Sequence, residues 1–510
     1  MPSEDKIYDF VILGSGLGGL ECAYILASEG HSVLVLEKNH QIGGNLQVFS
    51  REKSIFDTGV HYIGSLDEGE NLNQFFKYFG LLEDLKWHRL DDDCYDLMRF
   101  PDGSEYKYAQ GYDNFKKTLK EYFPEEAAGI DEYCKKVQEM CTYFPMYNLD
   151  PPESNSYTTT TDIVELGAYA YICSITENEK LRNVLAGINP LYAGVKEKTP
   201  LFVHALILNS YLTGSYRLKD GGSQIAIHLS RSIRKMGGEI LKRKKVVSAK
   251  FNDEGLISEV VCENGESYKG KKFISNIHPA QTLDIFGDDR FIKPYRKRIR
   301  SLENTKSSFI VHLVLKPETF PYLNYNIYQS FKDDAWEIIE STPEEWPSGY
   351  FMCTPATTKS DVYADCMSVM CYMDISEMEE WNQTANTIAA PGQRGESYEA
   401  FKKEKAELVI QKLELQFPDI REKIQSIHST TPLTFRDYIG DETGSMYGIL
   451  KDCNSPMRSL IDSRTKIKNL FLSGQNNIMH GVLGVTISAF TTCFNFIDKN
   501  ELMNKVKAAK

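Results

Sequence analysis

The sequence predicts an α/β protein made of two interleaved domains. Its 510 residues exceed what a single hydrophobic core usually organises, so two or three domains are expected. A glycine-rich turn between a short apolar strand and a helix opens the chain, and strands of the same kind recur in its middle and near its end. The segments between them are expected to build a second domain of mixed sheet and helices.

The first element is a short apolar run at 8–13 that ends at Gly14, which is typical of a buried parallel strand. A helix is expected over about 18–30, and a second strand over 32–36. Together these elements form one βαβ unit.

The turn of this unit carries the GxGxxG pattern of a Rossmann-type dinucleotide site. Gly14 permits the tight turn, Gly16 lets backbone approach a pyrophosphate, and Gly19 allows close helix–strand packing. The helix N-terminus adds free N–H groups and a partial positive charge. Glu37 ends the second strand, where a carboxylate would bind ribose hydroxyls. We therefore expect a bound dinucleotide; a glycine turn without a ligand is the alternative.

Two further features favour FAD as that dinucleotide. Gly43 and Gly44 follow the second strand, where a second glycine turn lets backbone pass along the cofactor. Near the end of the chain, a strand at 470–473, Gly474 and a helix suit the far end of a long dinucleotide. The sequence holds no second GxGxxG, so a dedicated NAD(P)H domain is not expected. The electron donor stays open between transient NAD(P)H, another redox protein and a quinone.

The middle of the chain alternates helical and β patterns. Periodicity predicts helices over 113–141, from 161 to about 212, from Gly221-Gly222-Ser223 to Gly237-Gly238, and over 398–416, with a polar loop at 150–161. The predicted strands are 240–245, 246–251, 257–262, 272–275, 309–315 and 362–372. The FAD-binding domain would then comprise 1–80, 216–300 and 441–510, and the substrate domain 81–215 and 301–440.

Charge and cysteine usage exclude several classes of protein. A net charge of −13 argues against nucleic-acid binding. The basic clusters at 242–245 and 293–300 are read as solvated faces, or as a patch that rests on anionic lipid headgroups. The 11 cysteines include no CxxC pair, which indicates reduced thiols and no metal site. We expect a cytoplasmic monomer or homodimer, either free or in peripheral contact with a membrane.

An apolar stretch at 482–497 is the one candidate for a membrane span. A span asks for about 20 apolar residues. Glycine and amide side chains interrupt the stretch that precedes this one. A buried helix behind a glycine turn is therefore the better interpretation.

Several segments carry a family resemblance. They are Gly43-Gly44, the run Phe-Asp-Thr-Gly-Val-His-Tyr-Ile-Gly at 56–64, and the segments 221–226, 397–401, 469–475 and 481–484. They resemble the retinol saturase branch of the phytoene desaturase and carotenoid isomerase superfamily. The resemblance covers nearly the whole chain, and its first and last segments are the specific ones.

The resemblance implies non-covalent FAD, a two-part fold like that of flavin amine-oxidase-type proteins, and redox or isomerisation at carbon–carbon double bonds of long isoprenoid or polyene lipids. It places Val246 beside the adenine and Asn476 where relatives often carry an acidic residue. The implied cofactor-binding residues are Gly14, Ser15, Gly16, Leu17, Gly18, Gly19, Glu37, Lys38, Gly43, Gly44, Asn45, Val246, Gly474, Gln475 and Leu483.

Catalytic candidates follow from the same segments. His61 and His480 are expected near the flavin ring, and Tyr62 is a weaker candidate proton donor; each histidine has the alternative of a structural, hydrogen-bonded role. The saturase branch favours reduction of a retinol- or carotenoid-like substrate. Desaturation, isomerisation, amine oxidation and non-catalytic prenyl-lipid binding are the alternatives.

Overall fold

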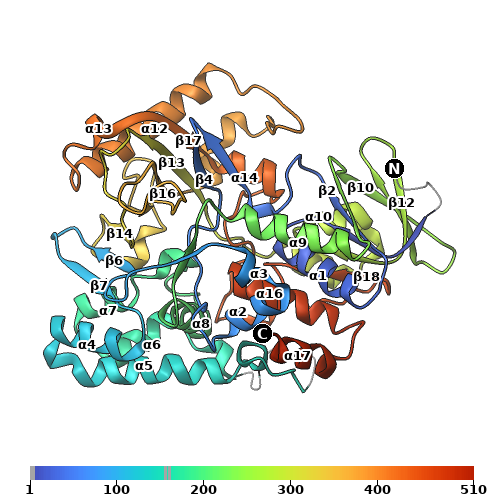
Figure 1. The fold of residues 1–510 in the computed structure, drawn as a ribbon, viewed down its shortest axis with the longest axis horizontal. Helices are drawn as coiled ribbons and strands as arrows, with labels where there is room; N and C mark the ends of the chain where they lie inside the picture. Colours follow the sequence, from blue (N-terminus) through green and yellow to red (C-terminus); the bar gives the residue numbers. More distant parts are fainter. Residues whose placement is uncertain (1–5, 154–157, 159–161) are drawn as a thin grey trace.

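The computed structural model describes residues 6–153, 158 and 162–510 (Figure 1). A seven-stranded sheet, here the nucleotide sheet, has the order β10-β11-β12-β1-β2-β9, with β18 paired to β12. Pairings among β18, β12, β1, β2 and β9 are parallel, and β10 and β11 extend the sheet as antiparallel strands. Its strands are β1 (Ile7–Leu13), β2 (Val33–Glu37), β9 (Glu239–Lys242), β10 (Val246–Phe251), β11 (Ile257–Cys262), β12 (Ser267–Ser275) and β18 (Leu470–Leu472). The chain therefore enters this sheet from its beginning, middle and end.

Helix α1 (Leu17–Ser28) is the centre of the nucleotide region. It packs between α9 (Ser223–Lys235) and α16 (Gly481–Cys493), which lie beside it in Figure 1. A Cβ at Gly19 would lie 2.1 Å from the carbonyl oxygen of Gly14, so only glycine allows this approach of helix to strand. Helix α10 (Pro279–Phe286) packs against β10.

A second seven-stranded sheet, here the substrate sheet, has the order β17-β13-β16-β15-β14-β6-β7. Its pairings are antiparallel except between β14 and β6. Alternation divides the strands between two cores: Phe309 and Val311 of β13 pack with α12 (Glu396–Glu414), whereas Ile310 faces the main core. The strands are β6 (Asp96–Arg99), β7 (Glu105–Tyr108), β13 (Ser307–Leu315), β14 (Asn326–Ser330), β15 (Gly349–Cys353), β16 (Cys366–Met373) and β17 (Ile424–Thr430).

A layer of helices closes the other side of the main core (Figure 1). It includes α2 (Asn71–Phe79), α3 (Leu81–Asp84), α4 (Tyr112–Tyr122), α5 (Ala127–Thr142), α6 (Ala168–Ile175), α7 (Glu179–Leu185) and α8 (Leu201–Leu212). The single helix predicted over 113–141 is wrong, because α4 ends before Pro124 and α5 begins at Ala127. Proline has no N–H to donate and disfavours a helical residue before it, so the helix breaks there.

Smaller elements complete the chain. They are the hairpin β3 (Val48–Arg51) and β4 (Ser54–Asp57), the pair β5 (Trp87–Arg89) and β8 (Tyr216–Leu218), and the helices α11 (Lys293–Arg300), α13 (Ile420–Lys423), α14 (Pro432–Ile439), α15 (Pro456–Ser459) and α17 (Lys499–Ala508). Within the described ranges, no helix combines the length and apolar character needed to cross a bilayer. Most of the loop predicted at 150–161 lies outside the described residues.

Two predicted strand boundaries are corrected. The strand predicted from 362 begins at Cys366, since the amides of Val362 and Tyr363 both donate to the Ser360 hydroxyl and form a turn. The strand predicted to reach 245 ends at Lys242, because Arg243 adopts a φ of 58° and turns the chain. Apolar and β-branched composition alone does not reveal such turns.

The two basic clusters carry acidic partners. Lys244 and Lys245 pair with Glu266 and Glu263 at 2.5 and 2.9 Å. On α11, Arg300 pairs with Asp284 and Asp288 at 2.6 and 2.8 Å, and Arg296 pairs with Asp288. Four of the nine basic residues in these clusters are thus paired with carboxylates within the chain.

Candidate functional site

A cavity of about 460 Å³, here the nucleotide groove, follows the C-terminal ends of β1, β2, β12 and β18. This edge of a parallel sheet is where such folds bind ligands. Of the residues predicted to bind a cofactor, those that line it are Gly14, Gly16, Leu17, Gly18, Glu37, Lys38, Gly43, Gly44, Asn45, Val246, Gly474 and Gln475. Helices α10 and α14 supply further walls.

The two glycine turns touch each other at the floor of the groove. Gly14 has a φ of 92° and donates its N–H to the carbonyl of Leu36 at 2.8 Å. A Cβ at Gly44 would lie 3.1 Å from the Cα of Gly16, and Gly43 donates to the Ser15 carbonyl at 2.9 Å. The two turns therefore contribute backbone without side chains to the floor, as close approach of a diphosphate requires.

Asn276 lies at the centre of this floor, and the sequence did not single it out. Cβ atoms placed on Gly16, Gly18, Gly19 and Gly474 would lie 3.0, 2.8, 3.0 and 2.5 Å from its side-chain amide. One asparagine side chain thus lies close to four glycine positions, and at Gly19 the carbonyl oxygen of Gly14 is closer still. The available signal was its position directly after the strand predicted at 272–275.

Glu37 is held by the turn it faces. Its Oε2 accepts the N–H and the hydroxyl of Ser15 at 3.0 and 2.5 Å, and its Oε1 accepts the N–H of Asn39 at 2.7 Å. The carboxylate is buried, yet it lines the groove and keeps lone pairs for a hydroxyl ligand. Ser15 lies beneath the groove, where it orients this carboxylate.

Lys38 and Asn476 connect the groove to its outer walls. The Lys38 ammonium donates to the carbonyl of Asp437 on α14 at 2.9 Å, and burial lowers its pKa to about 8. Oδ1 of Asn476 accepts the N–H of Ile449 at 3.1 Å, so this amide supports the loop beside the groove.

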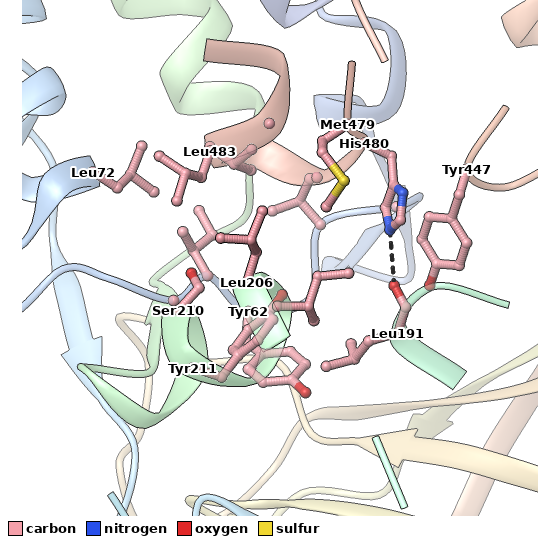
Figure 2. Close-up of a pocket in the computed structure, with 18 of the residues that line it drawn as sticks. Tyr62, Leu72, Leu191, Leu206, Ser210, Tyr211, Tyr447, Met479, His480 and Leu483 are labelled. Carbon is pink, nitrogen blue, oxygen red and sulfur yellow. Dashed lines mark hydrogen bonds between the residues drawn. The ribbon is translucent and has the colours of Figure 1, made fainter. Parts of the chain in front are cut away.

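An apolar cavity of about 150 Å³ lies next to the groove (Figure 2). One side is α8, which contributes Leu206, Ile207, Ser210 and Tyr211 at helical spacing. Another side is the row of cross-strand partners Tyr328, Phe351 and Met370 on β14, β15 and β16. The described residues that line it include no Asp, Glu, Lys or Arg.

The groove and the apolar cavity share part of their walls. The residues that line both are Gly59, Val60, Met446, Tyr447, Gly481 and Val482. Leu483, which was predicted to bind the cofactor, lines the apolar cavity and not the groove, and its contact with the cofactor stays a prediction. Its side chain projects from the first turn of α16 toward the substrate side, and the helix period decides this orientation.

His61 lies in the wall of the apolar cavity without a hydrogen-bond partner among the described residues, at either ring nitrogen. Burial lowers its pKa to about 4, so the ring is neutral near pH 7. An unsatisfied buried donor and acceptor cost free energy, which a bound ligand can recover. His61 is therefore an orphaned polar group that faces the site.

His480 and Tyr62 also line the cavity but have partners. Nε2 of His480 donates to the carbonyl of Leu191 at 3.3 Å, and its ring packs on Tyr447 at 4.6 Å (Figure 2). Burial lowers the pKa of His480 to about 4. The hydroxyl of Tyr62 lies 2.8 Å from the carboxylate of Asp96.

These residues fit FAD. Two side-chain-free turns suit a diphosphate, Glu37 suits a ribose, and the groove continues to an apolar cavity with an orphaned imidazole. A flavin ring at the shared wall would lie between the nucleotide groove and the apolar cavity.

Comparison with known proteins agrees with a flavin-binding fold. A family model described as flavin containing amine oxidoreductase matches residues 17–381. All-trans-retinol 13,14-reductase of Rattus norvegicus is 28% identical over 98% of this chain and 87% of the relative. A prolycopene isomerase of Arabidopsis thaliana is 24% identical over 95% of this chain and 82% of the relative. A solved structure of putrescine oxidase with putrescine bound is similar at a TM-score of 0.64, over 98% of this chain and 99% of that one. The two sequences are only 13% identical, so this similarity shows the fold alone.

Proposed function

This chain belongs to the family of flavin-containing amine oxidoreductases, and from that premise we propose that it reduces a carbon–carbon double bond in a long, apolar isoprenoid or polyene substrate. Its class, a FAD-dependent oxidoreductase of the retinol saturase and carotenoid isomerase type, agrees with its curated relatives. A retinol- or carotenoid-like substrate and the reductive direction are the new parts of the proposal.

The observation that carries the proposal is the apolar cavity beside the groove. Its described lining has no ionisable group other than histidine and tyrosine, so it offers no carboxylate to an ammonium group. Apolar walls of this kind match a hydrocarbon chain, since they gain free energy from its removal from water.

In the mechanism, the glycine turns bind the diphosphate and Glu37 binds a ribose. When bound, FAD supplies two-electron hydride chemistry at carbon. The side chains that β14, β15, β16 and α8 contribute to the apolar cavity orient the substrate and exclude water. Exclusion of water prevents loss of electrons to side reactions. The neutral His61 donates or accepts one hydrogen bond at the shared end of the cavity. NAD(P)H is the donor class that we propose for the two electrons.

The test uses purified protein and its visible spectrum. Photoreduced enzyme is mixed anaerobically with retinol, with a carotenoid and with putrescine, and flavin reoxidation and products are recorded. We expect reoxidation by a polyene with gain of two hydrogens, and reduction of the oxidised enzyme by NADPH or NADH. Peroxide formed from an amine would instead assign amine oxidation, and a colourless protein that takes up no FAD would assign lipid binding without catalysis.

Redox-neutral isomerisation is the second candidate, favoured by the similarity to prolycopene isomerase. It predicts a rearranged polyene with no net consumption of reductant. Product mass separates the two candidates, because only saturation adds two hydrogens.

A further inference from the structure

Three polar groups form a line from the apolar cavity into the protein interior. The hydroxyl of Tyr328 lies 2.7 Å from that of Tyr62, which lies 2.8 Å from Oδ2 of Asp96. Both tyrosines line the cavity, whereas Asp96 lies behind them and is completely buried. Distances of this length suit proton transfer along the line.

The parallel pairing of β14 with β6 assembles this line. Asn326 of β14 is the register partner of Asp96 on β6, and Tyr328 follows two residues later on the same face. Tyr62 reaches the pair from the segment after β4. Residues more than 200 positions apart in the sequence are thus brought together.

The hydrogen bonds around Asp96 decide where its proton can be. Arg217 only donates, and its guanidinium binds Oδ1 of Asn326 at 2.7 Å. The Nδ2 of Asn326 must then face Asp96, and it donates to Oδ1 of that carboxyl at 2.7 Å. A proton on Asp96 is therefore confined to Oδ2, the oxygen that faces Tyr62.

A protonated Asp96 orients both tyrosines toward the cavity. Asp96 would donate to the oxygen of Tyr62, and Tyr62 would donate to the oxygen of Tyr328. The hydroxyl hydrogen of Tyr328 then has no acceptor in this line and can point into the cavity.

Burial raises the pKa of Asp96 to about 7, although the hydrogen bonds from Asn326 and Tyr62 and the charge of Arg217 act to lower it. The titratable groups that interact with it are Arg217, Cys94, Tyr62, Tyr95, Tyr108, Tyr211 and Tyr328.

We propose that Tyr328 is the acid that protonates the substrate carbon, that Tyr62 relays the proton, and that Asp96 stores it. This inference rests on the proposed reduction of a double bond. It replaces Tyr62 as the terminal donor with a residue that the sequence did not suggest.

The proton and electron balance is complete in the reductive direction. The π bond of the substrate breaks; one carbon receives the hydride that reduced FAD supplies, and the other forms a C–H bond with the Tyr328 proton. Tyr328 regains a proton from Tyr62, and Tyr62 from Asp96. The Asp96 carboxylate is reprotonated from solvent between turnovers.

The experiment compares Tyr328→Phe, Tyr62→Phe and Asp96→Asn with the control Tyr95→Phe. Tyr95 is a buried tyrosine next to Asp96 whose hydroxyl has no hydrogen-bond partner among the described residues and which does not line the cavity. Reoxidation of photoreduced enzyme by the polyene is measured in single turnover, with FAD content and substrate affinity measured on the same samples. We expect Tyr328→Phe to lose a factor of about 10² or more in rate, as for loss of a general acid, with FAD and substrate still bound. Tyr95→Phe should keep the wild-type rate.

A second readout does not depend on turnover. Infrared difference spectra of the wild-type holoenzyme should show the C=O band of a protonated carboxyl that disappears as the pH rises through about 7, and Asp96→Asn should lack it. Wild-type rates in Tyr328→Phe, or the same titrating band in Asp96→Asn, would overturn the relay. Failure of wild-type enzyme to reduce any polyene overturns the proposed function and the acid role of Tyr328, while the band still decides whether Asp96 stores a proton.

Discussion

The nucleotide groove and the apolar cavity share six wall residues but are built in opposite ways. The groove floor is formed mainly by the backbone of two glycine turns, with the side chain of Asn276 beside them. The cavity wall is made of side chains, contributed by α8, three strands of the substrate sheet and the start of α16. A backbone site depends on local turns, whereas a side-chain site depends on how distant elements pack. The groove should therefore be sensitive to added volume, and the cavity to changes in polarity.

Added volume in the groove should have the largest effect. The Cβ of Gly16→Val would lie 3.0 Å from Asn276, and its methyl groups would occupy the diphosphate's space. We expect nearly complete loss of FAD with retained secondary structure, measured by absorbance and circular dichroism. Gly167→Val is the control, because the nearest atom to its Cβ is 3.5 Å away and it does not line the groove. Normal FAD content in Gly16→Val would contradict the placement of the diphosphate.

A polarity change behind the cavity should alter the pH dependence of stability. Asp96 has a pKa of about 7 in the folded protein against 3.8 ordinarily, so its contribution is fully present below pH 3.8 and is lost as the pH rises through 7. This difference corresponds to about 4 kcal/mol of unfolding free energy. The unfolding free energy of Asp96→Asn should therefore rise relative to that of wild type as the pH increases from 3.8 to about 7 and then stay at a constant difference, measured by urea unfolding of both proteins. Parallel pH curves would show that this carboxyl does not titrate in that range.

A polarity change in the groove should have a smaller effect. Glu37 accepts hydrogen bonds at both oxygens, and Glu37→Gln would turn an amide N–H₂ toward a backbone donor. We expect FAD affinity to fall by roughly 10-fold to 100-fold, equal to about 1.4–2.7 kcal/mol, measured by fluorescence titration of apoprotein. Ser15→Ala is the matched variant and should lose less, because one donor is removed and no new clash of donors arises.

The smallest effect concerns the orphaned imidazole. His61→Leu removes two unsatisfied buried nitrogens, so the apoprotein should gain about 1 kcal/mol or more in unfolding free energy. In the presence of FAD and substrate the gain should shrink or reverse, if the ring binds either ligand. Equal gains in apo and loaded protein would assign His61 a structural role only.

The same contrast explains what the sequence could predict. Gly14, Gly16 and Glu37 follow from local spacing, because one βαβ unit of about 30 residues fixes their relative positions. Tyr328 and Asp96 have no local signal, since only the pairing of β14 with β6 brings them to the cavity. The position of Leu483 in the wall of the apolar cavity also has no local signal, because sequence spacing does not reveal which neighbours a helix face meets.

The late position of β18 in the chain has a consequence for biosynthesis. Gly474 and Gln475, which follow β18, belong to the groove, and α16 closes over α1 only after them. A chain emerging from the ribosome cannot complete its cofactor site until Gly474 and Gln475 have been translated, long after Gly14. FAD loading is thus expected only after translation has passed β18, and products truncated before this strand would lack part of the groove.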